Sequence, residues 1–237
     1  MDNLLYKWQL FWHEFAENGA WKRVLGEGLV NTLMIAVIGL LMGIVIGTLI
    51  ASVRVMPKYK LLPRILDKIC GVYVGFFRGT PIVVQLLIAY YVLFPLCGIS
   101  IGSLNTCILV FGLNSGAYVS EIMRSGIQSV DIGQMEAGRA LGMSFASTMM
   151  RIVVPQAVKN ILPTLGNELI ALVKETSVVS FVAAVDIYKT FTDIGNVRYE
   201  YLMPYLFMAI IYIVLVAIIS LGVKLLERSL RKSDRSR

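Results

Sequence analysis

Long apolar segments alternate with short polar ones along most of this chain. The clearest is Leu29–Val53, where 25 consecutive residues carry no charge, and about 20 apolar residues suffice to cross a bilayer as a helix. We place five membrane spans, near residues 29–53, 69–97, 104–123, 161–185 and 203–223. The pattern therefore predicts an all-α membrane protein built as a bundle of about five transmembrane helices.

The second predicted span is interrupted. Proline lacks an amide hydrogen and disfavours helix at the residue before it, and glycine tolerates unusual dihedral angles. The sequence therefore predicts a helix break at Arg78, Gly79, Thr80 and Pro81. Part of 60–77 is alternatively an amphipathic helix along the inner membrane surface.

The first predicted span has glycines at four-residue spacing, at Gly39, Gly43 and Gly47. A face of small residues allows another helix to approach closely. Packing within the chain is the simpler interpretation of this face, and a seam between two copies is the alternative.

The fourth predicted span is unusually polar for a membrane segment. Ionisable groups at membrane depth cost several kcal/mol and usually face a cavity or a partner. The polar residues of this span are Asn167, Glu168, Lys174, Glu175, Thr176 and Ser177. Glu168 and Glu175 are seven residues apart and share one helix face, so each needs a partner on another helix, in water or at a surface. Alternatively, 174–177 lies at the membrane interface and is solvated.

The third predicted span contains a strip of small or polar residues, at Asn114, Ser115, Gly116 and Ser120, which ends at Glu121. Such a strip is typical of a pathway lining. Hydrogen bonding between helices explains it nearly as well.

A polar loop separates the third and fourth spans. Residues 132–141 are predicted to be helical, Gly142 suits a left-handed helix terminus, and Ser144 can cap a second helix. Glu136 and Arg139 give the first helix charged positions. This helix–turn–helix either presents itself to a soluble partner or is an ordinary loop.

Composition supports the membrane assignment and charge sets the orientation. The chain is 57% hydrophobic, with a mean hydropathy of +0.74. Lysine and arginine are enriched in cytoplasmic loops, and they concentrate in 54–68, 124–159 and 224–237. The N-terminus is therefore predicted outside and the C-terminus inside. The net charge of +7 then reflects orientation and anionic lipid, and not nucleic-acid binding.

The N-terminal residues 1–28 are predicted to be an amphipathic arm at the outer interface. They contain Trp8, Trp12 and Trp21, together with acidic residues, and so do not resemble a secretory signal.

The sequence offers little catalytic chemistry. His13 is the only histidine, and the three cysteines, Cys70, Cys97 and Cys107, match no metal motif and are interpreted as packing residues. No Gly-x4-Gly-Lys-Ser/Thr loop is present, so the chain is not expected to hydrolyse ATP. We therefore predict that it is not an enzyme and binds no metal or cofactor of its own.

The polar loop resembles the EAA signature of bacterial ABC importer permeases. That signature is Glu-Ala-Ala, three residues, Gly, nine residues, Ile, one residue, Leu-Pro. Here it reads Glu136-Ala137-Gly138, then Gly142, Ile152 and Val154-Pro155, with Gly138 and Val154 as the two departures.

The likeness covers about residues 27–228 and is closest to the permeases of polar amino acid importers, of the histidine, glutamine or arginine type. The other matching segments are Phe76–Pro81, Glu121–Ile127, Gly133-Gln134, Leu162-Pro163, Asn167 and Lys174–Ser177.

This resemblance implies a type I importer permease in the bacterial inner membrane. It implies an extracytoplasmic arm at 1–28, a permease domain at 29–228 with its coupling loop at about 131–155, and a basic cytoplasmic tail at 229–237. The implied partners are the lipid bilayer, a second permease subunit as homo- or heterodimer, two cytoplasmic ATPase subunits that bind ATP and Mg²⁺, and an extracytoplasmic amino-acid-binding protein.

The resemblance also assigns roles. ATPase coupling falls to Glu136, Ala137, Gly138, Arg139, Gly142 and Ser144. The substrate pathway is a separate hypothesis that rests on polar residues within apolar helices. We expect Glu168 to pair with the ammonium group, and the hydrogen-bonding residues to be Asn114, Ser115, Asn167 and Thr176. Arg78 could meet the carboxylate, although an interface or structural role beside the helix break is the simpler one. The rival function is an ion or solute channel without ATP coupling.

Overall fold

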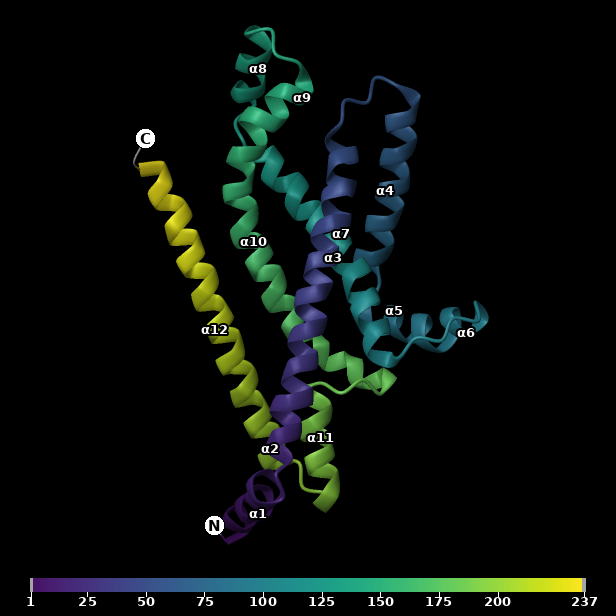
Figure 1. Ribbon diagram of the computed structural model, residues 1–237, viewed down its shortest axis with the longest axis vertical. Coiled ribbons are helices and arrows are strands. Elements are labelled where there is room, and N and C mark those ends of the chain that lie inside the picture. The colour runs from purple at the N-terminus through teal and green to yellow at the C-terminus, as the bar shows by residue number, and fades with distance from the viewer. Residues whose placement is uncertain (1, 236–237) are drawn as a thin grey trace. The chain divides into compact units, whose positions relative to one another are not determined.

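The computed structural model describes the backbone of residues 2–235 and the side chains of residues 3–230, and it is helical almost throughout (Figure 1). No strand occurs within these residues, which confirms the predicted all-α class. In chain order the helices are α1 (Asp2–Trp12), α2 (Ala20–Arg23), α3 (Val30–Val55), α4 (Leu61–Gly79), α5 (Ile82–Ile88), α6 (Phe94–Leu96), α7 (Ser103–Gln128), α8 (Ile132–Ala140), α9 (Phe145–Thr148), α10 (Val154–Glu175), α11 (Ile187–Arg198) and α12 (Leu202–Arg235).

Several of these helices are directly continued or preceded by turns of altered pitch. π-helical turns occupy His13–Glu17, Val24–Leu29, Ala89–Leu93 and Met149–Val153, and a 3₁₀ turn occupies Thr176–Val182. α12 continues through most of the predicted basic tail, whose last two residues, 236 and 237, lie outside the described chain.

Three of the described helical segments are long and apolar enough to cross a membrane: Ala20–Val55, Ser103–Gln128 and Leu202–Leu230. The interrupted pair formed by Leu61–Gly79 and Ile82–Leu96 passes the same test when taken together. The break predicted in the second span is therefore confirmed, and α4 begins eight residues before the predicted start of that span.

The predicted span at 161–185 needs correction. α10 begins earlier, at Val154, and ends at Glu175, after which the chain turns into the 3₁₀ segment. α10 is not among the segments that pass on length and apolarity, because its charged and amide side chains dilute its apolar content. By length and composition alone, the described segments provide three spans, or four when the interrupted pair is counted as one.

The chain forms two compact units, each assembled from three stretches. Unit 1 contains Met1–Gly39, Thr80–Gly112 and Ala171–Ile218, and unit 2 contains Leu40–Gly79, Leu113–Ile170 and Ile219–Arg237.

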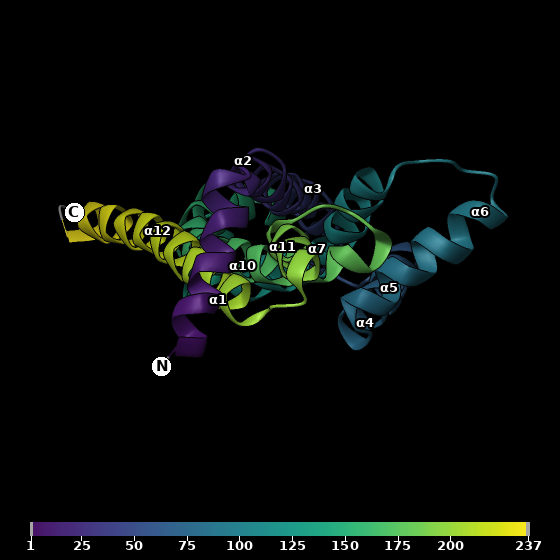
Figure 2. The ribbon, with the colours of Figure 1, turned by 90° about the horizontal axis from the view of Figure 1, so that it is seen from below.

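In unit 1, the N-terminal arm packs on α11 and the start of α12 (Figures 1 and 2). The arm is amphipathic, as predicted, because Phe11 is buried whereas the three tryptophans remain partly exposed. The Phe11 ring packs against Phe207 of α12, with ring centroids 4.6 Å apart and ring planes tilted by 42°. The buried core of this region consists of Phe11, Val24, Ile187, Phe191, Ile194 and Met203.

In unit 2, α3 and α7 approach closely along the glycine face of α3. A Cβ atom on Gly43 would lie 2.6 Å from Ser115 Oγ, and one on Gly47 would lie 2.7 Å from Val119. These contacts confirm that the glycine spacing serves packing within the chain. The buried core nearby consists of Val119, Ala157, Ile161 and Leu165.

The cysteines differ in their surroundings. Cys107 is buried and Cys70 is partly buried, in agreement with packing roles, whereas Cys97 is exposed. The packing interpretation is therefore wrong for Cys97.

Candidate functional site

The predicted helix–turn–helix between α7 and α10 is present as α8 and α9, which lie side by side near one end of α10 (Figure 1). α8 starts at an Asp131 cap, whose carboxylate accepts a hydrogen bond from the Gly133 amide at 2.7 Å. This cap was not predicted, although aspartate immediately before a helix is a common capping signal. The predicted helix at 132–141 is confirmed to within one residue.

α8 ends in a Schellman motif. Gly142 adopts a left-handed conformation with φ of 78°, its amide donates to the Arg139 carbonyl, and the Met143 amide donates to the Gly138 carbonyl at 3.0 Å. Glycine suits this position because it has no Cβ atom to clash there. The turn predicted at Gly142 is thus confirmed with its hydrogen bonds.

α9 starts at Ser144, as predicted, where the hydroxyl accepts a hydrogen bond from the Ser147 amide at 3.3 Å. α8 then packs on α9 through Gly138, which is buried. A Cβ atom at position 138 would lie 2.5 Å from Thr148 Cγ2 and 2.8 Å from Thr148 Oγ1. The two short helices form one tightly closed hairpin, which we call the coupling hairpin, residues 131–153.

The outer surface of the coupling hairpin is accessible. Glu136, Ala137 and Arg139 are exposed on α8. Two large apolar side chains are exposed beside them, Ile132 at 74% and Leu141 at 81%. Exposed apolar side chains bordered by charged ones are suited to a protein contact.

Two predicted pathway residues meet in unit 2. Ser115 on α7 is fully buried, and its hydroxyl donates to Glu168 Oε1 on α10 at 3.1 Å. Glu168 therefore has the partner on another helix that its position within an apolar segment demanded. Asn114, next to Ser115, is also buried and donates to the Phe77 carbonyl of α4 at 3.2 Å.

The remaining two pathway residues have different surroundings. Asn167 is exposed on α10. Thr176 belongs to unit 1, where it is buried and donates to the Val173 carbonyl at 2.8 Å.

The helix break occurs where it was predicted. α4 ends at Gly79 and α5 begins at Ile82, with Pro81 in an extended conformation between them. In unit 1, the Gln85 side chain donates to the Thr80 carbonyl at 3.0 Å and to its hydroxyl at 2.8 Å. These bonds satisfy polar groups that the interrupted helix leaves unpaired.

Arg78, which precedes the break, faces α7 in unit 2. Its guanidinium group lies 5.4 Å from the centre of the Tyr118 ring, a cation–π distance. One of its nitrogen atoms lies 3.9 Å from Glu121 Oε2. These contacts favour the structural role for this arginine.

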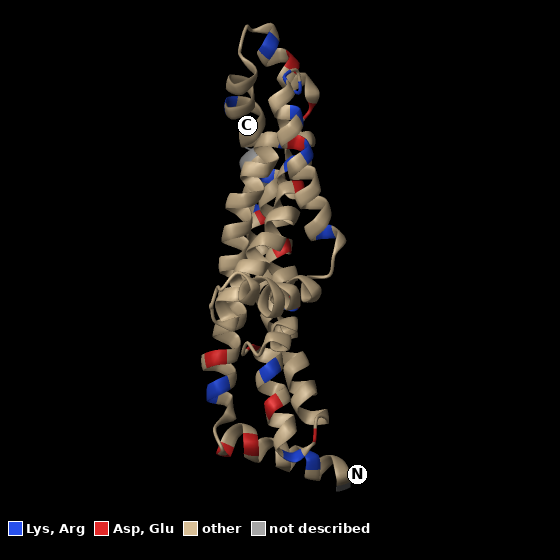
Figure 3. Ribbon diagram, turned by 90° about the vertical axis from the view of Figure 1, so that its right-hand side faces the viewer, with Lys and Arg blue, Asp and Glu red and all other residues tan. Residues whose placement is uncertain are grey.

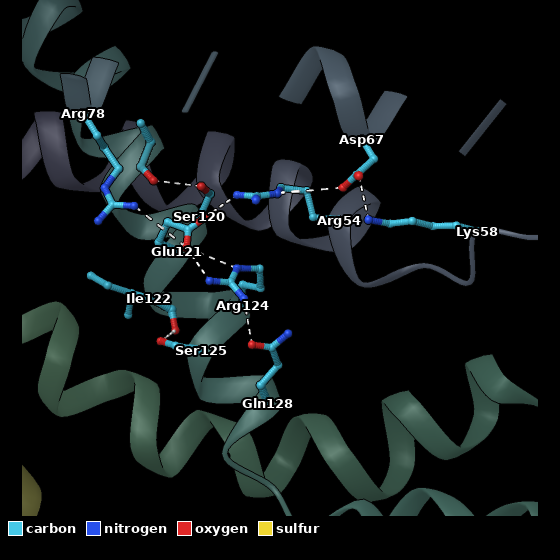
Figure 4. A network of polar contacts seen from close by, with 11 residues as sticks. Arg54, Lys58, Asp67, Arg78, Ser120, Glu121, Ile122, Arg124, Ser125 and Gln128 are labelled. Carbon is cyan, nitrogen blue, oxygen red and sulfur yellow. Dashed lines mark hydrogen bonds and ion pairs between the residues drawn. The ribbon is translucent and has the colours of Figure 1, made fainter. Parts of the chain in front are cut away.

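A network of charges, which was not predicted, converges on Glu121 (Figure 4). Arg124 donates to Glu121 Oε2 at 2.6 Å, and Arg54 of α3 pairs with Oε1. Arg54 also lies 3.9 Å from Asp67 of α4. The spacing of Glu121 and Arg124 on one helix was a usable signal, but the contributions of α3 and α4 depend on tertiary structure.

The described side chains do not assemble a metal site, since no group of three or more His, Cys, Asp or Glu is placed to hold an ion. The arrangement instead provides a closed hairpin with exposed charged and apolar side chains, and a carboxylate held by a hydroxyl between two helices.

Comparison with known proteins gives a consistent result. Residues 39–232 match the family described as "Binding-protein-dependent transport system inner membrane component". The chain is 38% identical to the arginine transport system permease protein ArtQ of Bacillus subtilis, over 88% of this chain and 93% of that protein. It is 39% identical to a putative glutamine transport system permease protein GlnP of Rickettsia bellii, over 86% of this chain and 91% of that protein.

Solved structures agree. One chain from a crystal structure of an amino acid ABC transporter is similar with a TM-score of 0.82 and 35% identity, over 91% of this chain and 98% of that one. A chain of the MetNI methionine ABC transporter, in an inward-facing conformation, matches with a TM-score of 0.76 and 19% identity over 91% and 99% of the two chains, which supports the fold alone.

Proposed function

The chain belongs to the family of binding-protein-dependent transport system inner membrane components, and on this basis we propose that it is the permease subunit of an ATP-driven importer for a polar or charged amino acid. The amino acid assignment rests on the arginine and glutamine permeases to which it is similar. The structural likeness to a chain of an amino acid ABC transporter supports the same conclusion.

The observation that carries the coupling role is the coupling hairpin. Its turn is fixed by the Schellman motif at Gly142 and its two helices are closed around Gly138, while Glu136 and Arg139 remain exposed. We propose that this surface docks on a cytoplasmic ATPase subunit, which binds ATP and Mg²⁺. A rigid hairpin suits this role because a flexible one would deform when the ATPase subunit moved and would not pass the movement to the permease.

Assembly follows from the same proposal. The permease pairs with a second permease subunit and two ATPase subunits, and an extracytoplasmic binding protein delivers the solute. In the bacterial inner membrane, the proposed orientation places the N-terminal arm outside and the coupling hairpin inside. ATP binding and hydrolysis then bias the permease pair between inward-facing and outward-facing states.

We propose that Glu168 contacts the ammonium group of the solute, because it is a carboxylate within an apolar helix. Ser115 holds this carboxylate from α7, so it positions Glu168. Asn167 is exposed near it in sequence and remains a candidate hydrogen-bonding residue, as does the buried Thr176. Asn114 already bonds the Phe77 carbonyl, which favours a structural role for its amide.

The test of the coupling role is co-purification of the ATPase with the permease. Glu136→Lys reverses an exposed charge on the hairpin, and Gly142→Pro is incompatible with a φ of 78° and removes the amide that bonds Arg139. Both should release the ATPase in detergent and abolish ATP-dependent uptake in proteoliposomes.

Glu17→Lys is the matched control, because Glu17 is also an exposed acid but lies on the N-terminal arm. It should retain the ATPase. Normal co-purification and uptake in both hairpin variants would contradict the docking role. Uptake that persisted without any ATPase would instead favour a channel.

A further inference from the structure

The turn between α11 and α12 presents one tyrosine in an unusual way. Tyr199 is 85% exposed, and its backbone is left-handed with φ of 53°. The Glu200 amide donates to the Gly195 carbonyl at 3.1 Å, which repeats the helix ending found at Gly142. In the coupling hairpin this position is a glycine, whereas here a tyrosine accepts a conformation that residues with a Cβ atom rarely adopt.

The residues on both sides of Tyr199 are fixed to the N-terminal arm. Arg198 pairs with Glu14 at 3.3 Å, and Glu200 pairs with Lys7 at 2.9 Å. The bond from Lys7 also lowers the pKa of Glu200 from its ordinary value. Two ion pairs, one on each side, thus hold the turn while the ring between them points to solvent.

The base of the turn is closely packed as well. A Cβ atom on Gly195 would lie 2.5 Å from the Tyr201 ring, and the Tyr201 hydroxyl donates to Asn196 at 2.9 Å. The turn is therefore preorganised, so little conformational entropy would be lost when a partner bound its tip.

The charged groups around the tip are largely paired within unit 1. Two ion pairs flank Tyr199. In addition, Asp193 forms an ion pair with Arg23 at 3.1 Å and another with Lys189. Figure 3 shows the acidic and basic positions close together near the N-terminus. Tyr199 and its neighbour Val197, which is 58% exposed, are the most exposed large apolar side chains of the turn itself.

We propose that Tyr199, assisted by Val197, is a docking contact for the extracytoplasmic solute-binding protein. The inference rests on the proposed function, which supplies both this partner and the orientation. Both ion pairs join the tip to the N-terminal arm, and the proposed orientation places that arm outside. Tyrosine is among the residues that dominate binding energy at protein interfaces.

A lipid headgroup is the competing occupant. The bilayer interface accepts tyrosine in many orientations, so it gives no reason for a strained backbone fixed by two ion pairs. A folded partner with a pocket for one ring requires such a fixed position, and the geometry therefore favours a protein.

The probe is a purified solute-binding protein. It is identified by its ability to stimulate ATP hydrolysis by the wild-type permease–ATPase complex in lipid nanodiscs. Its affinity is measured for Tyr199→Gly, which relieves the backbone strain, and for Tyr199→Asn, which tolerates the left-handed conformation without the ring. Both variants should weaken binding by about tenfold or more, with thermal unfolding temperatures equal to or above that of the wild type.

Tyr59→Gly is the matched control, because Tyr59 is also 85% exposed but lies between α3 and α4, on the side predicted to be cytoplasmic. It should leave affinity unchanged. Affinity within about twofold of wild type in both Tyr199 variants would overturn the inference, as would a loss seen in nanodiscs but absent in detergent, which would assign the ring to lipid. If no solute-binding protein stimulated the wild-type complex, the proposed function would fail and this inference with it.

Discussion

The contact between Gly138 and Thr148 gives the sharpest test of how the coupling hairpin is built. An alanine Cβ atom at position 138 would lie 2.5 Å and 2.8 Å from two Thr148 side-chain atoms. Thr148 cannot turn away, because it is fully buried and its hydroxyl donates to the Ser144 carbonyl at 3.1 Å. Its branched Cβ would in any case bring another substituent towards the same space.

The magnitudes decide the direction. Replacing glycine by alanine inside a helix stabilises it by about 1 kcal/mol, whereas overpacking a closed contact costs about 1–3 kcal/mol. Since two contacts fall below 3.0 Å, the cost lies in the upper part of that range. We expect Gly138→Ala to destabilise the hairpin by about 1–2 kcal/mol and to weaken its grip on the ATPase.

Removing the obstacle should reverse the effect. Thr148→Ala alone leaves a small cavity that costs about 1 kcal/mol, but in the double variant the new methyl group occupies that space. The double variant should therefore approach wild type, with a coupling energy of about 2 kcal/mol between the two positions. Thermal unfolding of the purified complex and amide exchange of Met143, whose amide bonds Gly138, measure this directly.

A refuting result is equally clear. Two results would contradict this account: Gly138→Ala is neutral or stabilising on its own, or the double variant unfolds at no higher temperature than Gly138→Ala. Either outcome would show that the close approach of α8 and α9 is not what fixes glycine at this position.

Three further predictions follow from separate contacts. Gly43→Ala should lower the thermal unfolding temperature, because its Cβ atom would meet Ser115 at 2.6 Å, whereas Gly71→Ala, with nothing within 4 Å, should leave it unchanged or raise it. Glu168→Gln keeps an acceptor for the Ser115 hydroxyl but removes the negative charge. Transport in proteoliposomes should fall at least tenfold without loss of assembly, which corresponds to about 1.4 kcal/mol or more of lost solute stabilisation. Unchanged transport would exclude an ammonium contact. Burial raises the pKa of Asp186 to about 6 from 3.8, so the folded state holds this proton more tightly than the unfolded state does. The free energy of unfolding should therefore decline as pH rises from about 4 through about 6, by roughly 3 kcal/mol in total. The Asp186→Asn variant should lack this pH dependence when its unfolding is measured.

Local signals predicted the coupling hairpin well. The turn at Gly142 and the cap at Ser144 depend on single residue types at fixed positions, and both occur where they were expected. The break before Pro81 was predictable for the same reason. Such features depend on backbone chemistry within a few residues, so a sequence read without its tertiary structure still contains them.

Contacts between distant elements were less predictable. The pairing of Glu168 with Ser115 required a partner on another helix, and the sequence indicated the need without the identity. The charges on Glu121 arrive from α3, α4 and α7, which no spacing along the chain reveals. The end of α10 at Glu175 was missed because apolar content continues beyond it, and apolar content alone does not distinguish an α-helix from a 3₁₀ turn.

One structural connection explains how the coupling hairpin could act on Glu168. From Phe145 to Glu175 the chain is helical without interruption, through α9, the π-helical turn Met149–Val153 and α10. Glu168 lies about 36 Å along this rod from the cap at Ser144, at 1.5 Å per residue. A helix transmits an axial displacement along its length, so a shift of the hairpin would move the Glu168 carboxylate relative to Ser115 on α7. Helix movements of this kind are about 1–2 Å. Such a shift, added to the present distance of 3.1 Å, would separate donor and acceptor beyond hydrogen-bonding range. Displacement of the coupling hairpin by a docked ATPase would thus change the Glu168–Ser115 contact through the helix itself, without a separate chain of side-chain contacts.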